Sequence, residues 1–216
     1  DGIPVAPVDP NAPPTVTAIA GELSPGGRAA AMRSSQAILA THQDDTYLIW
    51  NGRRARIDPT DRRVTFNLGL DPGATRPVEI SSALFDAMPV TEPLGVPVIP
   101  GAGAPSQLLP GSVVGRVLET KDANGSVSGF YVLLPDGVQK ITSFVADLLR
   151  TADSQGVTAP QLVSPDKLVD IPQVEVLNVG FYPTGKLEFV DPQANPVTCV
   201  GWQKQTTDRQ AAVTFF

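Results

Sequence analysis

Cysteine and histidine are nearly missing from the sequence, which holds one of each among 216 residues. A single cysteine, Cys199, excludes an internal disulfide and a zinc site made of cysteines. It is either a buried, unreactive thiol or half of a disulfide to a cysteine outside this sequence. The single histidine, His42, belongs to a predicted exposed turn beside Asp44 and Asp45, where it has too few companions to bind a metal. Neither residue indicates catalysis.

Long apolar runs and an excess of positive charge are also missing. No stretch approaches the roughly 18 consecutive apolar residues of a membrane span, and the N-terminal DGIPVAPVDPNAPP lacks the basic start and apolar core of a signal peptide. The net charge is −6, so we expect no nucleic-acid partner. With 42% hydrophobic residues, the chain can fold around a core. Because it begins at Asp, we interpret it as a piece of a longer protein.

Motifs for nucleotide binding and catalysis are absent from the sequence. The phosphate loop GxxxxGK followed by Ser or Thr does not occur, and Gly101 and Gly103 are followed by Pro105, not by a helix start that could bind phosphate. Five aspartates could be offered as acid and base pairs, but each fits a helix cap or a helix surface better. They are Asp58, Asp61, Asp71, Asp86 and Asp147. We therefore predict no catalytic residue, no cofactor and no metal site.

One short element occurs twice in the chain. Residues 47–57 read YLIWNGRRARI and residues 131–141 read YVLLPDGVQKI. Asn-Gly in the first and Pro-Asp-Gly in the second favour tight turns, so each element predicts a β-hairpin. One more strand is predicted before each hairpin. The predicted strands are 36–41, 47–50 and 54–57 in the first copy, and 112–119, 130–134 and 138–141 in the second.

The repeat extends beyond the hairpins into a helix. Residues 80–86 read ISSALFD and residues 141–147 read ITSFVAD, which match at Ile, Ser and Asp. The first copy is longer between its hairpin and this match, so we interpret it as carrying an insertion. The chain thus contains two related units, each a β-meander plus a helix. The predicted elements are a strand over 78–80 followed by Ser81 as an N-cap, a helix over 82–88, a helix over 144–151 with Ser143 as N-cap, and an inserted helix over 59–67 with Asp58 as cap and Gly69 at its end.

The remaining segments indicate a joining core. Residues 93–111 are rich in Pro and Gly and lack a usable period, so we interpret them as a linker. Strands are predicted over 174–179, 186–190 and 197–202, with a helical turn over 164–170. The predicted divisions are 1–34, a lead-in with a core strand near 16–19; 35–92, the first unit; 93–111, the linker; 112–160, the second unit; and 161–216, the core segment. The fold class is α+β and β-rich: two small β-meander-plus-helix repeat units joined by a central, mainly antiparallel β core.

Arg53, Arg54 and Arg56 form a basic cluster that supports a binding hypothesis. On a strand, Arg54 and Arg56 face one way and Arg53 the other, so two guanidinium groups could meet a carboxylate-rich partner or an anionic polymer. The alternative is a charged edge strand that is protected from pairing with another sheet. We treat the three arginines as candidate partner-binding residues and leave the edge-strand interpretation open.

Longer stretches resemble one protein family. The blocks YLIWNGRRARID, LGLDPGATRPVEISSALFDAMPVTEPL, VPVIPGAGAP, FYVLLPDGVQKITSFVADLLR and CVGW occur in this order between Ser35 and Trp202. They resemble EccB, the bitopic membrane component of type VII (ESX) secretion systems in actinobacteria. The resemblance implies an extracytoplasmic domain with a central β core and four repeats similar to a phage-lysin cell-wall-binding fold. This chain would hold the core and the two middle repeats, and Cys199 would pair with a cysteine upstream of this sequence.

The resemblance also implies a function and a location. It predicts a structural module of the ESX secretion complex on the extracytoplasmic (periplasmic) side of the inner membrane, anchored in the full protein by one N-terminal transmembrane helix. Its partners would be other copies of itself, other ESX core components and the cell wall. Two alternatives stay open: ATP hydrolysis, because the family is described as ATP-hydrolysing, and peptidoglycan binding. With no nucleotide motif in the sequence, the residues favour the non-enzymatic role.

Overall fold

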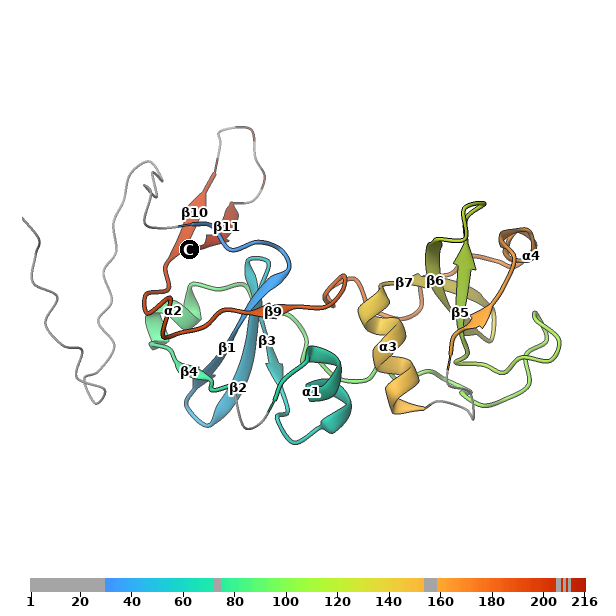
Figure 1. The fold of residues 1–216 in the computed structure, drawn as a ribbon, viewed down its shortest axis with the longest axis horizontal. Helices are drawn as coiled ribbons and strands as arrows, with labels where there is room; N and C mark the ends of the chain where they lie inside the picture. Colours follow the sequence, from blue (N-terminus) through green and yellow to red (C-terminus); the bar gives the residue numbers. More distant parts are fainter. Residues whose placement is uncertain (1–29, 72–74, 154–158, 205–206, 208, 210) are drawn as a thin grey trace, which may run out of the picture.

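The computed structural model describes residues 30–71, 75–153, 159–204, 207, 209 and 211–216. The strand predicted near 16–19 lies outside these residues. Figure 1 shows two small bodies of sheet and helix side by side, with a two-stranded ribbon at one end. Within the described ranges, no helix has the length and apolar character that crossing a membrane requires.

Unit 1, residues 36–96, is built on an antiparallel meander. In chain order its elements are β1 (Gln36–His42), β2 (Asp45–Trp50), β3 (Arg53–Ile57), α1 (Arg62–Leu68), β4 (Val78–Glu79) and α2 (Ser82–Asp86). The sheet order is β3-β2-β1-β4, and β4 joins β1 in parallel. Asn51 and Gly52 turn the chain between β2 and β3 with φ of 43° and 75°, the positive values that a type I′ turn requires. The first predicted hairpin is confirmed.

Unit 2, residues 117–179, repeats this plan. Its elements are β5 (Val117–Lys121), β6 (Val127–Leu134), β7 (Gly137–Ile141), α3 (Ser143–Ala152), β8 (Gln161–Leu162) and α4 (Pro165–Val169). The sheet order is β7-β6-β5-β8, and β8 joins β5 in parallel as β4 joins β1. The register agrees as well, since Tyr47 lies opposite Arg56 in unit 1 and Tyr131 lies opposite Lys140 in unit 2. The duplication predicted from the sequence is confirmed.

The structure pairs the helices of unit 1 with those of unit 2 differently from the sequence prediction. In each unit one helix follows the third strand (α1 and α3), the parallel strand comes next, and a second helix follows it (α2 and α4). Helix α1 is therefore the counterpart of α3, so its interpretation as an insertion is wrong, as is the match of α2 with α3. The shared Ile, Ser and Asp were a poor guide because a strand end followed by a Ser or Thr N-cap occurs at many helix starts.

A further shared segment returns along the outer edge of each meander. After α2, the Arg54 N–H on β3 donates to Pro89 O at 2.9 Å; after α4, the Val138 N–H on β7 donates to Pro172 O at 2.8 Å. We call residues 89–96 and 172–179 the return segments. Both read Pro-x-x-Glu-x-Leu-x-Val. This second internal match marks the full length of the repeat, and the sequence prediction missed it.

Helix α1 begins later than predicted. Asp58 accepts hydrogen bonds from the backbone and side chain of Thr60 and so forms a turn. Asp61 then serves as the N-cap, accepting from the Arg63 N–H, and the helix begins at Arg62. The predicted end of α1 at Gly69 is confirmed, with a φ of 71°. Two other boundaries differ from the prediction: the N-cap of α3 is Thr142 instead of Ser143, and β5 begins at Val117 instead of residue 112.

The predicted core segment, residues 161–216, contributes to three sheets instead of forming one, and the first of its strands is β8 in the sheet of unit 2. Its elements after unit 2 are β9 (Glu188–Phe189), β10 (Val200–Gln203) and β11 (Ala212–Phe215). Strand β9 joins β1 in parallel, and β10 with β11 forms a separate antiparallel ribbon. The strand predicted over 174–179 is wrong, because that stretch belongs to the irregular return segment of unit 2; β11 had no sequence prediction. The strand-rich α+β class is confirmed.

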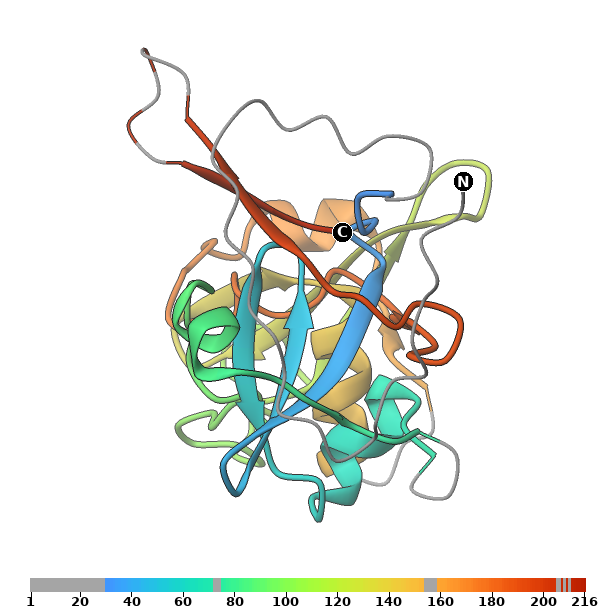
Figure 2. The same ribbon diagram turned by 90° about the vertical axis from the view of Figure 1, so that its left-hand side faces the viewer.

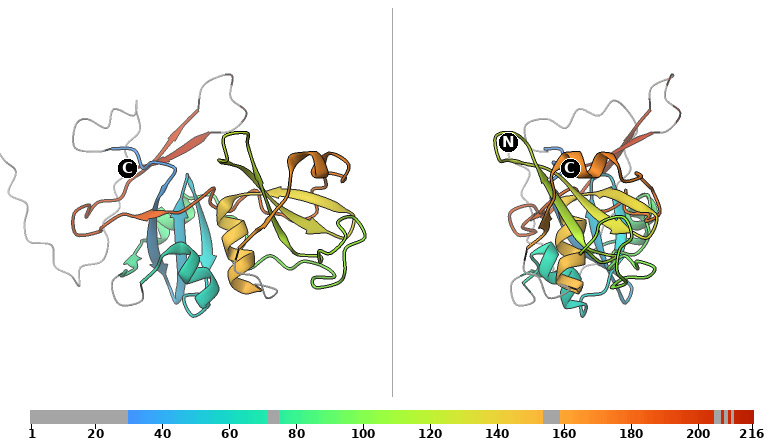
Figure 3. Two further views of the ribbon diagram at one scale, coloured as in Figure 1. Left: turned by 45° about the vertical axis from the view of Figure 1, so that its right-hand side comes forward. Right: turned by 90° about the vertical axis from the view of Figure 1, so that its right-hand side faces the viewer.

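Both units share one hydrophobic core. A continuous cluster joins Trp50 and Leu68 of unit 1 to Leu134 and Leu148 of unit 2. Leu94, in the stretch predicted as a linker, is buried in the same cluster. Figure 3 shows α3 standing between the two sheets. Because the core crosses from one unit to the other, we expect them to unfold as one cooperative body.

Each unit also has an outer cluster on the far face of its sheet. In unit 1 this cluster holds Ile49 and Met88, and Phe215 of the ribbon packs on it. Figure 2 shows the ribbon crossing in front of the strands of unit 1. In unit 2 the equivalent positions, Leu133 and Ile171, are covered by a loop that precedes β5. The ribbon therefore takes the place over unit 1 that a loop takes over unit 2.

Candidate functional site

The three candidate partner-binding arginines lie on β3 with the alternation that the sequence predicts. Arg53 lies opposite Trp50, on the inner face, and Arg54 lies opposite Ile49, on the outer face. Arg56 shares the outer face, where its Nη2 lies 2.6 Å from an Asp45 carboxylate oxygen. The Arg54 Nε donates to a backbone carbonyl of α2 at 3.1 Å. Two of the three cations therefore already have partners within the chain, and binding of an outside partner stays a prediction.

Phe85 of α2 is held between a cation and an imidazole. The His42 ring stacks on Phe85 with a centroid distance of 4.1 Å, and the Arg54 guanidinium carbon lies 3.6 Å from the same centroid. Two groups so close to one centroid cannot share a face of the ring, so they occupy opposite faces. Tyr47 meets Phe85 edge-on. We call this arrangement the Phe85 clamp; it fastens α2 to the sheet. His42 is thus half-buried on the sheet, not in an exposed turn as predicted.

The Phe85 clamp has an apolar counterpart in unit 2. The positions equivalent to Arg54 and Phe85 are Val138 and Leu168, which pack together in the outer cluster of unit 2. A cation on an aromatic ring in one unit therefore does the packing that two aliphatic side chains do in the other. The contacts of Arg54 therefore indicate that this side chain stabilises the fold of unit 1.

We expect Arg54→Ala to lower the free energy of unfolding by about 1–2 kcal/mol, because it removes the cation from Phe85 and the hydrogen bond to its carbonyl. Arg54→Val should lose less, since valine packs at this position in unit 2. Urea unfolding followed by circular dichroism measures both. Arg53→Ala is the control and should stay within about 0.5 kcal/mol of the parent. Equal losses for Arg53→Ala and Arg54→Ala would contradict the clamp.

Polar contacts between the units lie at the return segments. The Tyr182 hydroxyl donates to Gly95 O at 2.7 Å, and Asn178 Nδ2 donates to Glu92 Oε1 at 2.8 Å. Tyr182 is 8% exposed, and burial raises the pKa of its hydroxyl above the ordinary value of 10.0. The neutral phenol is therefore the form that belongs in this interface.

Stability should fall as the pH rises above about 10. Between the ordinary tyrosine pKa and the raised pKa of Tyr182, the folded chain keeps a proton that the unfolded chain has lost. Tyr182→Phe should begin about 1 kcal/mol less stable and then lose less over the same range, because the titrating group is gone. Urea midpoints at about pH 8 and about pH 10.5 give the comparison. A pH profile for Tyr182→Phe parallel to that of the parent, with Tyr131→Phe as control, would exclude Tyr182 as the cause.

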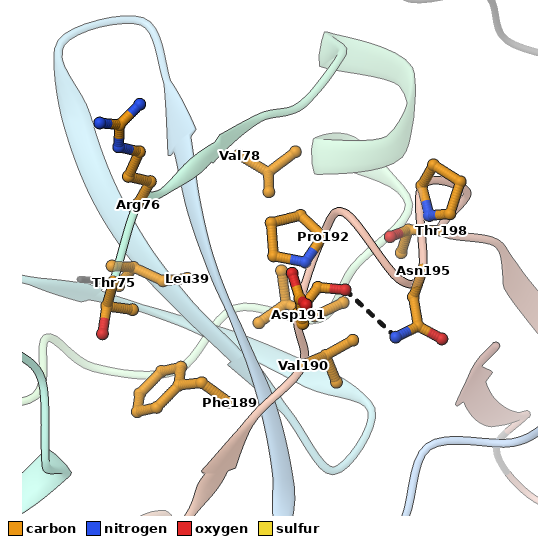
Figure 4. A pocket seen from close by; sticks show the side chains of 12 residues that line it. Leu39, Thr75, Arg76, Val78, Phe189, Val190, Asp191, Pro192, Asn195 and Thr198 are labelled. Carbon is orange, nitrogen blue, oxygen red and sulfur yellow. Dashed lines mark hydrogen bonds between the residues drawn. The ribbon is translucent and has the colours of Figure 1, made fainter.

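A pocket of about 340 Å³ lies beside β1, where β4 and β9 leave part of its edge uncovered. Figure 4 shows Leu39 and Phe189 on one side of it and Asp191 and Asn195 on another. The Asn195 Nδ2 donates to Asp191 O at 3.1 Å, which closes the loop on itself. Arg76 and Asp191 are the ionisable residues of the lining.

Cys199 is exposed, and no described residue forms a disulfide with it. Its backbone pairs with that of Phe216, which places it at the end of the β10–β11 ribbon. The interpretation as a buried thiol is therefore wrong, and a disulfide to a cysteine outside this sequence stays a prediction. In the part of the chain that the structure describes, no group of three or more His, Cys, Asp and Glu could hold a metal ion.

Sequence reasoning missed Gln139, a buried polar residue on β7. Its Oε1 accepts from the N–H groups of Val176 and Leu177 at 2.9 Å and 2.8 Å, and its Nε2 donates to Leu177 O at 2.7 Å. In unit 1 the equivalent Leu94 N–H donates to Arg56 O on the strand itself. A side-chain amide therefore replaces a backbone contact in unit 2. The available signal was a glutamine at an inward position of a strand.

Known proteins match the chain over nearly its whole length. The family model described as type VII secretion system ESX-1, transport TM domain B (EccB) matches residues 5–216. The chain is 57% identical over 203 residues to the ESX-2 secretion system ATPase EccB2 of Mycobacterium tuberculosis, covering 94% of this chain and 41% of that protein. It is 37% identical over 209 residues to the ESX-3 secretion system ATPase EccB3 of Mycolicibacterium smegmatis, covering 93% of this chain and 40% of that protein. The chain thus spans less than half the length of these relatives.

Two solved structures share the fold. The periplasmic assembly from the ESX-5 inner membrane complex matches with a TM-score of 0.74 and 36% identity, over 90% of this chain and 47% of that one. The EccB3 dimer from the ESX-3 core complex matches with a TM-score of 0.78 and 35% identity, over 87% of this chain and 48% of that one. Since the family match, the sequence identity and the fold agree over the same residues, the chain belongs to the EccB family of type VII secretion proteins.

Proposed function

We propose that this chain is an extracytoplasmic assembly module of a type VII (ESX) secretion complex, on the periplasmic side of the inner membrane. The single core across both units carries this proposal, because it makes them one body of fixed shape that neighbouring subunits can pack against. The relatives solved as a periplasmic assembly and as a dimer support the same role.

Parts outside this chain complete the proposal. The parent protein would be anchored by one N-terminal transmembrane helix, and this chain would hold the central core and the two middle repeats of four. The proposed divisions start from 1–34, 35–92, 93–111, 112–160 and 161–216, with residues 93–96 moved to the first unit and residues 161–179 to the second, because the return segments, β8 and α4 lie there. Cys199, whose side chain is exposed, would form a disulfide with an upstream cysteine, worth about 2–4 kcal/mol. The partners would be other copies, other ESX core components and the cell wall.

Assembly of the full-length protein tests this role. Deleting residues 36–190 should abolish the membrane complex on native gels of detergent extracts, and a normal complex would contradict the proposal. Arg53→Glu tests the arginine hypothesis separately. It should reduce the amount of complex if β3 meets a carboxylate-rich partner. Lys167→Glu, on α4 at the far end of unit 2, is the matched charge reversal and should leave the complex intact.

ATP hydrolysis is the second candidate, because the names of the curated relatives describe them as ATPases. Positioned cations and Mg²⁺ ligands are what phosphoryl transfer needs. Calorimetric titration of the chain with about 5 mM ATP and Mg²⁺ is expected to release no binding heat. Saturable heat would favour the ATPase role for this part of the protein. Cell-wall contact is tested separately by sedimentation with purified sacculi.

A further inference from the structure

Phe66 is a large aromatic side chain that the fold leaves in solvent. It lies on α1, where Val64 and Leu68 face the core and are 1% and 0% exposed, whereas Phe66 is 75% exposed. The packing of α1 therefore does not require an aromatic residue at this position. Single exposed apolar side chains are common on protein surfaces, so Phe66 indicates binding only together with a second feature.

A hollow beside Phe66 is that second feature. It measures about 210 Å³ and is lined by Phe66, Asn67, Gly69, Phe144, Asp147 and Lys186. Phe144 is 3% exposed and packs beside Tyr182 in the shared core, so its ring forms a fixed apolar floor. Helices α1 and α3 lie side by side here (Figure 3), and Thr151 Oγ1 donates to Asn67 Oδ1 at 3.4 Å. The hollow thus sits between the two units and has an aromatic wall and an aromatic floor.

The charges around the hollow are unbalanced. Two ion pairs contribute no net charge: Asp147 with Arg150 at 3.2 Å, and Asp61 with Arg63 at 2.8 Å. Among the described residues, Lys186 has no hydrogen bond or ion pair, and neither has the side chain of Arg62. Arg62 lies one turn before Phe66 on the same face of α1. One unpaired cation, Lys186, therefore lines the hollow, and a second, Arg62, lies one turn from its aromatic wall, on a chain of net charge −6. This arrangement favours an acidic ligand.

We propose that the hollow between α1 and α3 binds one apolar side chain of an acidic peptide segment in a partner protein. The anchoring side chain would lie on Phe144 and against Phe66, and carboxylates on either side of it would face Lys186 and Arg62. At such sites the apolar anchor supplies most of the affinity, and the flanking charges select the partner and speed association. The proposal goes beyond the assembly role, because this binding can be measured on the chain alone.

Two peptides that differ only in charge test the binding. The acidic probe is acetyl-Glu-Glu-Leu-Phe-Glu-Glu-amide, and the neutral probe is acetyl-Gln-Gln-Leu-Phe-Gln-Gln-amide; each is titrated into the ¹⁵N-labelled chain and followed by NMR. We expect the acidic probe to bind with a Kd on the order of 1 mM and the neutral probe about tenfold more weakly. The shifted amides should be those of residues 66–69, 144–147 and 186. Raising NaCl from about 0.05 M to about 0.5 M should remove most of the difference.

Matched variants separate docking from folding. Phe66→Ser and Lys186→Gln should each weaken the acidic probe about fivefold or more and leave the unfolding midpoint unchanged, because both side chains lie outside the core. Val169→Ser removes a side chain that is 80% exposed on α4 and should bind the probe like the parent. Equal binding of the two probes, shifts confined to other surfaces, or an equal loss in Val169→Ser would overturn the proposal. So would self-association in sedimentation that Phe66→Ser abolishes, because a second copy would then be the occupant.

Discussion

Gly137→Ala is expected to lower the free energy of unfolding of the whole chain by about 3 kcal/mol. A Cβ at this position would overlap Pro172 O and lie 2.8 Å from Val174 Cγ1. The Pro172 carbonyl has little freedom to move, because it accepts the Val138 N–H at 2.8 Å and so holds the return segment on β7. Relief of the overlap would break this contact and lift the segment from the sheet.

The loss of stability caused by Gly137→Ala should be detected in unit 1, although Gly137 lies in unit 2. Trp50, 3% exposed in the shared core, reports unfolding by fluorescence once the other tryptophan is removed with Trp202→Phe. In this background we expect the thermal midpoint of the Trp50 signal to fall by about 6–12 °C. If unit 2 unfolded by itself and the Trp50 midpoint stayed in place, the shared core would not couple the two units.

Gly180→Ala is the matched control for this substitution. A Cβ at Gly180 would meet no atom within 4 Å, and its φ lies outside the left-handed region. The same chemical change should therefore stay within about 0.5 kcal/mol of the parent. Comparable losses at both glycines would indicate an effect on backbone freedom, not the contact with Pro172.

Gln139→Met should also cost about 3 kcal/mol, for a different reason. Methionine nearly preserves the volume of glutamine but makes none of its three hydrogen bonds to Val176 and Leu177. Gln139 is 5% exposed, so the backbone groups it leaves have poor access to water. Buried polar groups without partners are among the costlier consequences of a substitution.

Hydrogen exchange locates this effect. The amides of Val176 and Leu177 should exchange faster with solvent in Gln139→Met. Exchange of the amides in the β1–β2 pair should change only as far as the free energy of global unfolding changes. Gln161→Met is the control, because the Gln161 side chain makes one hydrogen bond among the described residues, accepting from Ser112 Oγ at 2.7 Å. It should cost about 1 kcal/mol. Unchanged protection at residues 176–177 in Gln139→Met would show that the glutamine does not hold the return segment.

The hairpins were predictable because their signals are local. Asn51 and Gly52 accept positive φ, and the flanking residues alternate, so a few neighbouring residues specify turn and strands together. The match of the helices was not predictable in the same way. Caps at Asp61, Ser81 and Thr142 are chemically alike, and only the position of each helix after its strand distinguishes them. The true signal, Pro-x-x-Glu-x-Leu-x-Val, lay in the return segments.

For the candidate site residues, too, some properties were predictable from the local sequence and others were not. Alternation on β3 predicted which way Arg53, Arg54 and Arg56 point, and the register confirms it. Alternation could not show that Arg54 meets Phe85, because the two are brought together by the packing of α2 on the sheet. Nor could it show that Phe66 stays in solvent, since helical periodicity places it between Val64 and Leu68 without deciding how far the core extends.

By itself the sequence determined the two meanders, the tight turn at Asn51 and Gly52, and membership of the EccB family, because each of these depends on the order of nearby residues. Only the tertiary structure decided that one core spans both units, that Gln139 holds a distant return segment, and that a charged hollow lies between α1 and α3. These features arise from contacts between residues far apart in the chain. The free energies of these contacts depend on close packing in three dimensions, which cannot be predicted from a local sequence pattern.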